Sequence, residues 1–413
     1  MKILLITQWF TPEPDFKGLP FARELLRRGH DVQVITGFPN YPGGHLYPGY
    51  RIRWRQRECL DGVPVLRVPL YPSHDRSKFG RAANYLSFFV SASILGGTMT
   101  RKPDVIYAYH PPLTTGLAAA VIGAFKRVPF VLDIQDMWPD TIAATGMLSN
   151  HRLLRSIGRT CRYAYRKAAA ITVLSPGFKK LLISRGVQEE KIRVVFNWTD
   201  EHAHSPRPRN AEFARSLGLP DDRFIVMFAG TMGRAQALDT VLDAAKIVAA
   251  KAPDVLFAFV GSGVESERLR TLASALAETT GNVRFIPRQP MSVMGDVLAC
   301  ADALLVHLRN DPLFRVTIPS KTQAYMAVGK PILMGVEGDA AELVRKANAG
   351  ICFHPEDAEG LARAALTLRG MSADARAALG ENGRQFYEKE LSFSAGVTVF
   401  ETLFASLASR PRL

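Results

Sequence analysis

Two basic residues in the second half of the chain are placed where a bound anion would need them. Arg234 lies in a glycine-containing run at residues 230–236, and Lys321 follows Ser320 at the start of an expected helix. Glycine lets backbone N–H groups approach an anion, and a helix N-terminus attracts negative charge. An anion would also offset the unfavourable position of a lysine in a first helical turn, where Ser320 is the expected N-cap. These features predict a diphosphate site made of Gly230, Gly233, Arg234, Gln236, Ser320 and Lys321, although a structural turn explains the glycine run alone equally well.

Further candidates for this site follow neighbouring expected strands of the second half. Gly261 and Gly263 come after residues 256–260, although Ser266 stands where a dinucleotide-binding fingerprint has its third glycine. Arg288 comes after the strand expected at residues 283–286. Ligands of parallel α/β sheets bind at the carboxyl ends of the strands, so these residues are also expected to bind the anion.

The first half carries polar candidates at its own strand ends. Asp133 and Asp136 stand around the end of the strand expected at residues 130–134, and His110 follows the strand expected at residues 105–108. One aspartate is expected to position a substrate hydroxyl or take its proton, and the other to cap the following turn. For both aspartates, a capping or hydrogen-bonding role is the alternative. For His110, the alternative is that it lines the wall of the binding site without taking part in the chemistry. Gly18, after the first strand, would let the backbone approach a phosphate.

Charge is distributed unevenly along the 413 residues, whose formal net charge is +14. Residues 1–200 contain 28 Lys and Arg against 14 Asp and Glu, whereas residues 201–413 contain 24 of each. A basic half suits a phosphorylated substrate or anionic lipid headgroups, and nucleic acid is not expected because interleaved aromatic residues are lacking. The four cysteines form no CxxC pair, which predicts neither a metal site nor disulfides and favours a reducing cytoplasm.

Short apolar runs alternate with helix-length segments throughout the chain, which predicts βαβ units and parallel sheets covered by helices. One series of strands ends near residue 196, and a second series begins at residue 224 after a loop rich in Pro, Arg and His. The fold class is therefore α/β, with doubly wound Rossmann-like domains at residues 1–198 and 199–394. Residues 395–413 are expected to form a helix that returns to the first domain.

Residues 82–100 raise the question of a membrane, because they contain no charged side chain and many apolar ones. A spanning helix needs about 20 predominantly apolar residues, and this run also contains serines, threonines and a Gly-Gly pair. Spanning is therefore not expected. A buried helix is favoured, and a helix that dips into a bilayer surface is the alternative.

Motifs in both halves resemble those of the retaining GT4 glycosyltransferases. In the second half they are Gly230 to Leu238, Phe259 to Gly263, Ala301 to Val306 and Ile318-Pro319-Ser320-Lys321 with the segment that follows it to Ile332. In the first half, Phe10 to Pro14, Arg28 to Val32, Gly37 to Pro42 and Asp133 to Pro139 resemble the branch that builds bacterial surface polysaccharides such as colanic acid and O-antigen. The resemblance covers nearly the whole chain.

The resemblance implies a GT-B architecture in which two Rossmann-like domains face a cleft. The second domain is expected to bind a nucleotide-sugar donor, expected to be a UDP-sugar, and the first a lipid-linked or oligosaccharide acceptor. Transfer would retain the anomeric configuration and need neither a metal nor a further cofactor. The basic first domain predicts a peripheral contact with an anionic membrane surface, at the cytoplasmic face of the plasma membrane.

Two departures from the family pattern keep other functions open. The family's pair of glutamates is replaced by Val316 and Ala324, so contacts to the donor sugar and ribose are lost or supplied by neighbours such as Asp311, Arg315, Gln323 or Tyr325. Asp133 stands where many relatives have a histidine. The alternatives are an inactive nucleotide-sugar-binding scaffold subunit and a GT-B enzyme that epimerises or phosphorylates.

Overall fold

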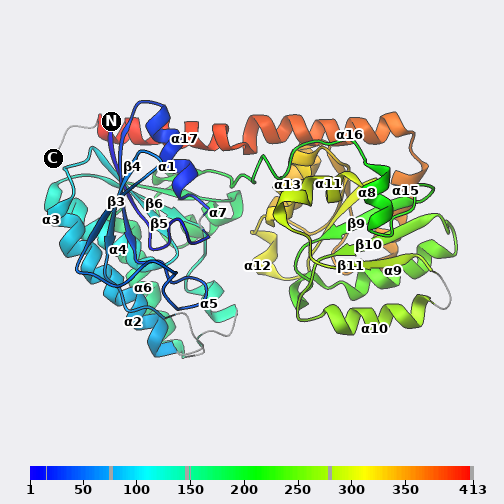
Figure 1. The fold of residues 1–413 in the computed structure, drawn as a ribbon, viewed down its shortest axis with the longest axis horizontal. Coiled ribbons are helices and arrows are strands. Elements are labelled where there is room, and N and C mark those ends of the chain that lie inside the picture. The colour runs from blue at the N-terminus through cyan, green and yellow to red at the C-terminus, as the bar shows by residue number, and fades with distance from the viewer. Residues whose placement is uncertain (15, 74–77, 145–147, 149, 278–280, 410–413) are drawn as a thin grey trace. The chain divides into compact units, whose positions relative to one another are not determined.

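The chain folds into two compact units, each with its own sheet (Figure 1). The computed structural model describes residues 1–413 except 15, 74–77, 145–147, 149, 278–280 and 410–413. Unit 1 contains Met1–Leu174, Phe178–Val195 and Val397–Leu413, and unit 2 contains Ser175–Gly177 and Phe196–Gly396. Both are layered α/β units, which confirms the predicted fold class.

Unit 1 is built on an eight-stranded sheet with the order β3-β4-β2-β1-β5-β6-β7-β8. All neighbouring strands are parallel except the antiparallel pair β3 and β4. The order reverses between β1 and β5, so the loops after these two strands flank the position where doubly wound sheets bind ligands. The strands are β1 (Lys2–Ile6), β2 (Asp31–Gly37), β3 (Gln56–Leu60), β4 (Val63–Val68), β5 (Val105–His110), β6 (Phe130–Ile134), β7 (Ala170–Val173) and β8 (Ile192–Val194).

Strand β3 was not expected from the sequence. It is an edge strand whose residues alternate between half-buried and exposed, and its Arg57 and Cys59 face solvent. Buried Arg67 of β4 explains part of the pairing, because its guanidinium donates to the Glu58 carboxylate at 2.6 Å. Polar side chains that protect a sheet edge hide the apolar alternation that otherwise identifies a strand.

Helices cover both faces of this sheet. On one side α2 packs on α4, and α4 packs on α6. The helices of unit 1 are α1 (Leu19–Arg27), α2 (Lys78–Ser91), which continues through a π-helical turn (Ala92–Gly96) into α3 (Gly97–Met99), α4 (Leu113–Lys126), α5 (Asp140–Ala144), α6 (His151–Lys167) and α7 (Pro176–Ser184), whose first residues belong to unit 2.

The uncharged run at residues 82–100 forms this α2–α3 helix, and only one of its faces is buried. Phe88 is fully buried, whereas the side chains of Leu86, Val90 and Ile94 are 57%, 51% and 56% exposed. The expectation of a buried helix is therefore correct for one face and wrong for the other. Spacing of four residues places the exposed apolar side chains on a single stripe.

Unit 2 has a six-stranded, fully parallel sheet with the order β11-β10-β9-β12-β13-β14. Strands β9, β10 and β12 are completely buried, as expected of parallel strands with helices on both faces. The order reverses between β9 and β12. The strands are β9 (Phe224–Ala229), β10 (Val255–Val260), β11 (Val283–Ile286), β12 (Ala303–His307), β13 (Ile332–Gly335) and β14 (Gly350–Cys352).

Helices follow almost every strand of unit 2, as the alternation in the sequence predicts. They are α8 (Ala211–Ser216), α9 (Asp239–Ala249), α10 (Ser266–Ala277), α11 (Met294–Ala299), α12 (Pro312–Arg315), α13 (Ser320–Val328), α14 (Asp339–Ala347), α15 (Ala358–Gly370) and α16 (Ala373–Phe386). Helix α13 is short and almost entirely buried, which fixes the position of its first turn.

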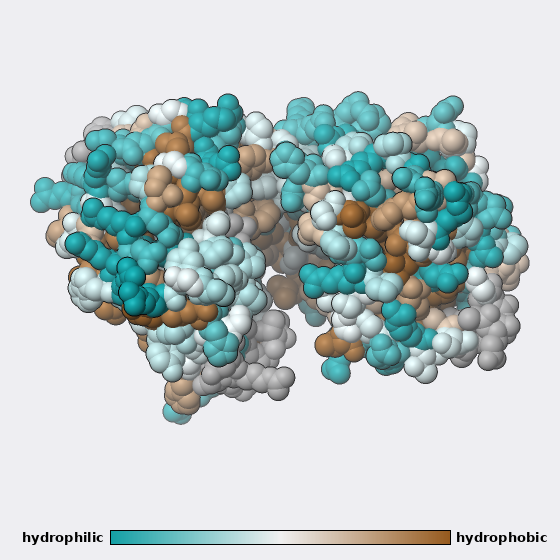
Figure 2. Space-filling model, viewed as in Figure 1, coloured by the Kyte–Doolittle hydropathy of each residue, from teal (hydrophilic) through white to brown (hydrophobic). Residues whose placement is uncertain are grey.

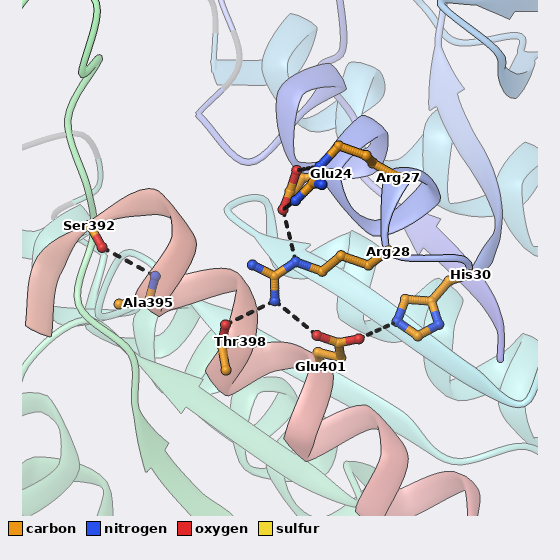
Figure 3. A network of polar contacts seen from close by, with 8 residues as sticks. All are labelled: Glu24, Arg27, Arg28, His30, Ser392, Ala395, Thr398 and Glu401. Atoms are coloured by element: carbon orange, nitrogen blue, oxygen red, sulfur yellow. Dashed lines mark hydrogen bonds and ion pairs between the residues drawn. The ribbon is translucent and has the colours of Figure 1, made fainter. Parts of the chain in front are cut away.

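The last helix, α17 (Phe393–Ala408), belongs to unit 1 from Val397 onward. Phe400 is fully buried, and its ring centroid lies 5.3 Å from that of Phe21 and 5.5 Å from that of Tyr107. Beside it the Glu401 carboxylate binds Arg28 at 2.9 Å and His30 at 2.8 Å (Figure 3). The hydrogen bond from Arg28 is the main cause of a lowered Glu401 pKa.

One helical run, Ala373–Ala408, is long and apolar enough by length and composition to cross a membrane, among the residues that the structure describes. Core helices of globular units meet the same criterion. In this run, Phe400 and Phe404 are buried in the core of unit 1, so at least these apolar side chains have a packing role in the fold.

Candidate functional site

Two glycine loops meet at the carboxyl ends of β9 and β10 in unit 2. Gly230 and Gly261 have φ angles of 140° and 134°, in the region that favours glycine. A Cβ atom on Gly261 would collide with the Gly230 carbonyl oxygen, and one on Gly263 would collide with that of Met232. The structure therefore brings Gly230, Gly261 and Gly263 together by backbone packing that any side chain would disrupt.

Lys321, in the first turn of α13, reaches the same place. A Cβ atom on Gly230 would lie 2.9 Å from the Lys321 Nζ, and this ammonium lies 3.4 Å from the centroid of the Phe228 ring. Burial lowers the Lys321 pKa to about 7, and no carboxylate in the described part of the chain offsets that effect. A buried cation over an aromatic face at a helix N-terminus is arranged to meet an anion.

The N-terminus of α13 has no side-chain cap. Pro319 occupies the N-cap position, and Ser320 is the first helical residue, so the expectation that Ser320 is the N-cap is wrong by one position. Proline has no side-chain acceptor for the N–H groups of the first turn. The Thr322 N–H is bound to the Pro319 carbonyl oxygen at 2.9 Å, so the N–H groups of Ser320 and Lys321 are the ones left for a ligand.

A short 3₁₀ helix, Arg234–Gln236, follows the first glycine loop and is held from within the protein. The Gly233 N–H donates to Gln236 Oε1 at 3.0 Å, so both predicted site residues build the turn. His307, at the end of β12, lies with Nδ1 2.7 Å from the Gln236 carbonyl oxygen, and its Nε2 accepts from the Glu356 N–H at 3.2 Å. Since Nε2 accepts, the proton is on Nδ1 and the ring is neutral, in agreement with a His307 pKa lowered by burial.

The two predicted arginines of this site are exposed. The Arg234 side chain is 85% exposed, and its Nε lies 3.3 Å from Glu265, which also pairs with Arg268. Exposed pairs of this kind contribute little stability, so Arg234 can exchange Glu265 for a ligand anion at low cost. Arg288 is exposed on the loop that follows β11.

Val316 and Ala324 stand at the family's glutamate positions, and most of the neighbours expected to replace the glutamates have structural contacts. Asp311 caps α12 and Arg315 pairs with Glu337 at 3.0 Å. The Tyr325 hydroxyl exchanges hydrogen bonds with the N–H and carbonyl of Ala229.

Gln323 differs from these neighbours. Its side chain is buried, and its Oε1 has no hydrogen-bond partner among the described residues. An unsatisfied buried acceptor is uncommon, and a ligand hydroxyl is one group that can satisfy it. Gln323 is therefore the neighbour best placed to replace a glutamate contact.

In unit 1, Asp133 is completely buried and fully used by its neighbours. Its Oδ2 accepts from Lys17 at 2.9 Å, from Tyr107 at 2.7 Å and from Gln135 at 2.9 Å. Its Oδ1 accepts from Thr172 at 2.6 Å. These four donors tie the loop before α1, strand β5, the end of β6 and strand β7 to one carboxylate, which gives Asp133 the geometry of a structural anchor.

Asp136 and His110 both contact Trp138. The Trp138 indole N–H donates to Asp136 Oδ2 at 3.3 Å, and its ring lies edge-on to His110 at 5.4 Å between centroids. Asp136 is half-buried, whereas His110 is fully buried and neither of its ring nitrogens has a partner in the described part of the chain. Burial lowers the His110 pKa to about 4, so its imidazole is neutral near pH 7.

Gly18 is buried at the N-cap of α1, beside Lys17. Its φ of −101° lies outside the left-handed region that favours glycine. The Lys17 ammonium lies 4.8 Å from the Phe400 ring centroid, and burial is the main cause of a lowered Lys17 pKa. The buried pair of Lys17 and Asp133 is thus covered by α17.

Glu13 links the loops after β1 and β2. Its carboxylate accepts from the N–H groups of Phe10 at 3.1 Å, Asn40 at 2.8 Å and Tyr41 at 2.8 Å. Burial outweighs these three hydrogen bonds and raises the Glu13 pKa to about 7. Tyr41 in turn packs on Trp9 with ring centroids 4.6 Å apart.

Little in the sequence indicated that Lys17, Glu13, His307 or Trp138 is important. Lys17 and Asp133 are 116 residues apart, and His307 binds a backbone carbonyl 71 residues away. Only their positions after strands could have indicated them. Among the described residues, no group of three or more His, Cys, Asp or Glu is arranged to hold a metal ion.

Two doubly wound units with glycine loops, a cation and a helix N-terminus at the strand ends define the GT-B class of glycosyltransferases. A family model described as "Glycosyl transferase 4-like domain" matches residues 19–198, and one described as "Glycosyl transferases group 1" matches residues 210–386. The chain belongs to the GT4 family of glycosyltransferases, which confirms the resemblance found in the sequence.

Curated relatives and solved structures agree with this assignment. The putative colanic acid biosynthesis glycosyl transferase WcaI of Escherichia coli K12 is 26% identical over 374 residues, which cover 87% of this chain and 90% of the relative. The probable glycosyltransferase WbjE of Pseudomonas aeruginosa is 25% identical over 324 residues, which cover 75% and 78%. Anabaena HepE, solved in complex with UDP and glucose, has a TM-score of 0.67 at 17% identity, covering 98% of this chain and 100% of HepE, and so shows the shared fold.

Proposed function

We propose that this chain transfers a sugar, with retention of anomeric configuration, from a nucleotide sugar to a lipid-linked or oligosaccharide acceptor of a bacterial surface polysaccharide. The main support is Lys321, a buried ammonium without a carboxylate partner in the described chain, set against Gly230 at an uncapped helix N-terminus. The donor is a UDP-hexose or UDP-N-acetylhexosamine, by analogy with HepE and its bound UDP.

The donor groups of unit 2 suit a diphosphate leaving group. In the transfer, the bond between the anomeric carbon and the diphosphate oxygen breaks, and its electron pair stays on the diphosphate. The Lys321 ammonium and the N–H groups that start α13 stabilise that charge, and the exposed Arg234 and Arg288 add to it. With these groups in place we propose that the reaction proceeds without a metal ion.

The acceptor groups of unit 1 lie around Trp138. We assign to half-buried Asp136 the hydrogen bond to the acceptor hydroxyl, whose oxygen forms the new bond to the anomeric carbon and whose proton passes to this carboxylate. Neutral His110 also contacts Trp138 and offers ring nitrogens to a second hydroxyl. Buried Asp133 holds the strand ends together and does not touch the substrate.

The exposed face of α2 supports a lipid-linked acceptor at an anionic membrane surface. Leu86, Val90 and Ile94 line an apolar hollow of about 510 Å³ together with Trp54, whose side chain is 70% exposed. Figure 2 shows hydrophobic residues at the surface of unit 1 among hydrophilic ones. The exposed arginines that flank Trp54 add charge that favours anionic lipid, and they are Arg51, Arg53, Arg55 and Arg57.

Flotation with vesicles that contain an anionic lipid tests the membrane contact. The paired substitution Val90→Ser and Ile94→Ser should abolish co-flotation at low salt, because it removes apolar side chains from the proposed contact. The fold should be kept, since both side chains are exposed and support no core. Val264→Ser is the matched control, since Val264 is an 84% exposed apolar residue of unit 2. Equal flotation by all three proteins would contradict the contact.

Thermal-shift measurements with a panel of nucleotides and nucleotide sugars test the donor site. A diphosphate-containing ligand should raise the melting temperature of the wild type and fail to do so for Lys321→Ala. The base and sugar that give the largest shift identify the donor class. Equal shifts of the melting temperature in both proteins would contradict the proposed donor site at Lys321.

Val316 and Ala324 favour one second candidate, a scaffold subunit that binds nucleotide sugar without transferring it. The two candidates differ in turnover. A nucleotide sugar that stabilises the protein but releases no nucleoside diphosphate with any acceptor would favour the scaffold.

A further inference from the structure

A basic hollow lies in unit 1 between α6 and the segment that follows α7. It measures about 650 Å³, which is within the range of small-molecule sites. Five of its lining residues are cationic and none is acidic: Arg159, Arg162, Arg166, Arg185 and Lys191. A neighbouring hollow of about 300 Å³ shares Arg162, Tyr165 and Arg185 and extends to Trp138.

Helix α6 concentrates positive charge on one face. Its arginines at positions 152, 155, 159, 162 and 166 follow alternating spacings of three and four, which places them on a single stripe. The helix contains no Asp or Glu to separate them. Neighbouring like charges on a helix are unfavourable, so this arrangement suggests a selected role in binding.

Tyr165 places a polar group in the lining of both hollows. Its side chain is buried, and besides this burial a hydrogen bond with the Cys161 thiol is one cause of its raised pKa. Burial is the main cause of a raised Tyr165 pKa, so the hydroxyl keeps its proton near neutral pH and can donate to an anion.

The ion pairs around the hollow leave most of its charge available. Arg185 binds Asp140 at 2.6 Å, and Lys191 donates to the carbonyl oxygens of Arg166 and Ala168 at the end of α6. The side chains of Arg159, Arg162 and Arg166 are exposed. Planar guanidinium groups bind phosphate or carboxylate with two parallel hydrogen bonds, which a neutral sugar cannot match.

We infer that this hollow, lined by Arg159, Arg162, Arg166, Arg185, Lys191 and Tyr165, binds an anionic group, phosphate or carboxylate, that is carried by the saccharide acceptor. The smaller hollow reaches Trp138, which holds the Asp136 carboxylate, so a saccharide that enters the acceptor region can extend toward the arginines. The assignment of the anion to the acceptor rests on the proposed function, whereas the anion site itself does not.

Calorimetric titration of the full chain tests the anion site, with tripolyphosphate, trigalacturonate and neutral maltotriose as the probes. The double substitution Arg162→Gln and Arg166→Gln should weaken binding of the preferred anion by at least about tenfold, and Tyr165→Phe by a smaller factor. The control double substitution Arg152→Gln and Lys167→Gln removes the same charge from the same helix outside the hollow, and we expect it to change affinity by less than about twofold at moderate salt. Melting temperatures show whether each variant is folded.

The two anionic probes distinguish phosphate from carboxylate. The inference would be overturned if the site and control substitutions weakened anion binding equally. It would also be overturned if neutral maltotriose bound as tightly as the anionic probes. Variant-dependent binding of anionic vesicles without binding of either small anion would also overturn it, in favour of a lipid-facing surface. UDP binding at Lys321, measured on the same variants, should stay unchanged, so failure of the anion site is distinguishable from failure of the proposed function.

Discussion

The Lys321 ammonium should make donor binding depend on pH in a direction and range that the structure sets. Burial lowers the pKa of free Lys321 to about 7, from the ordinary 10.5. A bound diphosphate favours the charged form and raises this pKa again. Donor binding therefore takes up a proton, and affinity should fall as the pH rises above about 7 until the pKa of the complex is reached.

The magnitude follows from the protonated fraction of the free protein. With a pKa of about 7, about 90% of Lys321 is charged at pH 6 and about 3% at pH 8.5. The association constant should therefore fall about 30-fold across that range, equivalent to about 2 kcal/mol, if the pKa in the complex is above about 9.5. UDP-glucose is a suitable titrant because its diphosphate is a diester that neither gains nor loses a proton in this range.

Calorimetry at several pH values checks this dependence, and three variants isolate its origin. Lys321→Arg stays charged and should flatten the profile, and Lys321→Met should bind weakly at every pH. Lys330→Met is the matched control, since burial also lowers the pKa of Lys330, which follows the opposite end of α13. A wild-type affinity that is constant from pH 6 to 8.5, or a fall that persists in Lys321→Met, would refute the reasoning.

Three further predictions address the remaining parts of the two units. Gly261→Ala should abolish UDP-induced thermal stabilisation, because its Cβ would collide with the Gly230 carbonyl at a φ of 134°; normal stabilisation in this variant would show that the loops do not need their close contact. Asp133→Asn should lower the free energy of unfolding by about 3 kcal/mol, because it removes the carboxylate that pairs with the buried Lys17 ammonium. Asp136→Asn should leave stability unchanged and lower kcat. The reverse pattern in denaturant titrations and turnover assays would exchange the roles of the two aspartates. Glu13 has a folded-state pKa of about 7 against an ordinary 4.5, so the folded protein holds its proton longer and stability should fall as the pH rises from about 4.5 to 7; Glu13→Gln should reduce that fall, and an identical profile would contradict the assignment.

Local patterns in the sequence predicted the fold because both sheets are mainly parallel and buried. Strand β9 at residues 224–229 is a continuous apolar run, and strand β6 at residues 130–134 is apolar except for Asp133, which the sequence shows directly. Strand β3 was missed because its exposed Arg57 and its partly buried Glu58 obscure the pattern. The outward face of α2 was misjudged because apolar side chains around a helix do not reveal which of them lack a partner.

In the candidate site, the sequence pointed to those residues whose expected role follows from their neighbours along the chain. Lys321 was identified from its place in a first helical turn, and the structure adds its contact with Gly230, 91 positions earlier in the chain. Asp133 was identified as polar at a strand end, but its burial under Lys17 depends on a pairing across 116 residues that no local pattern encodes. Long-range packing of this kind is not visible in the sequence.

The most direct test of the proposed transfer follows both products in a single reaction. The protein is incubated with the nucleotide sugar that stabilises it most and with polyprenyl-diphosphate saccharides, and mass spectrometry detects the acceptor while a coupled assay measures nucleoside diphosphate. We expect the acceptor to gain the mass of one sugar with an equimolar release of nucleoside diphosphate, in the wild type and in Lys330→Ala but not in Lys321→Ala. Conversion of the nucleotide sugar without growth of any acceptor, or equal rates in the wild type and Lys321→Ala, would contradict the account.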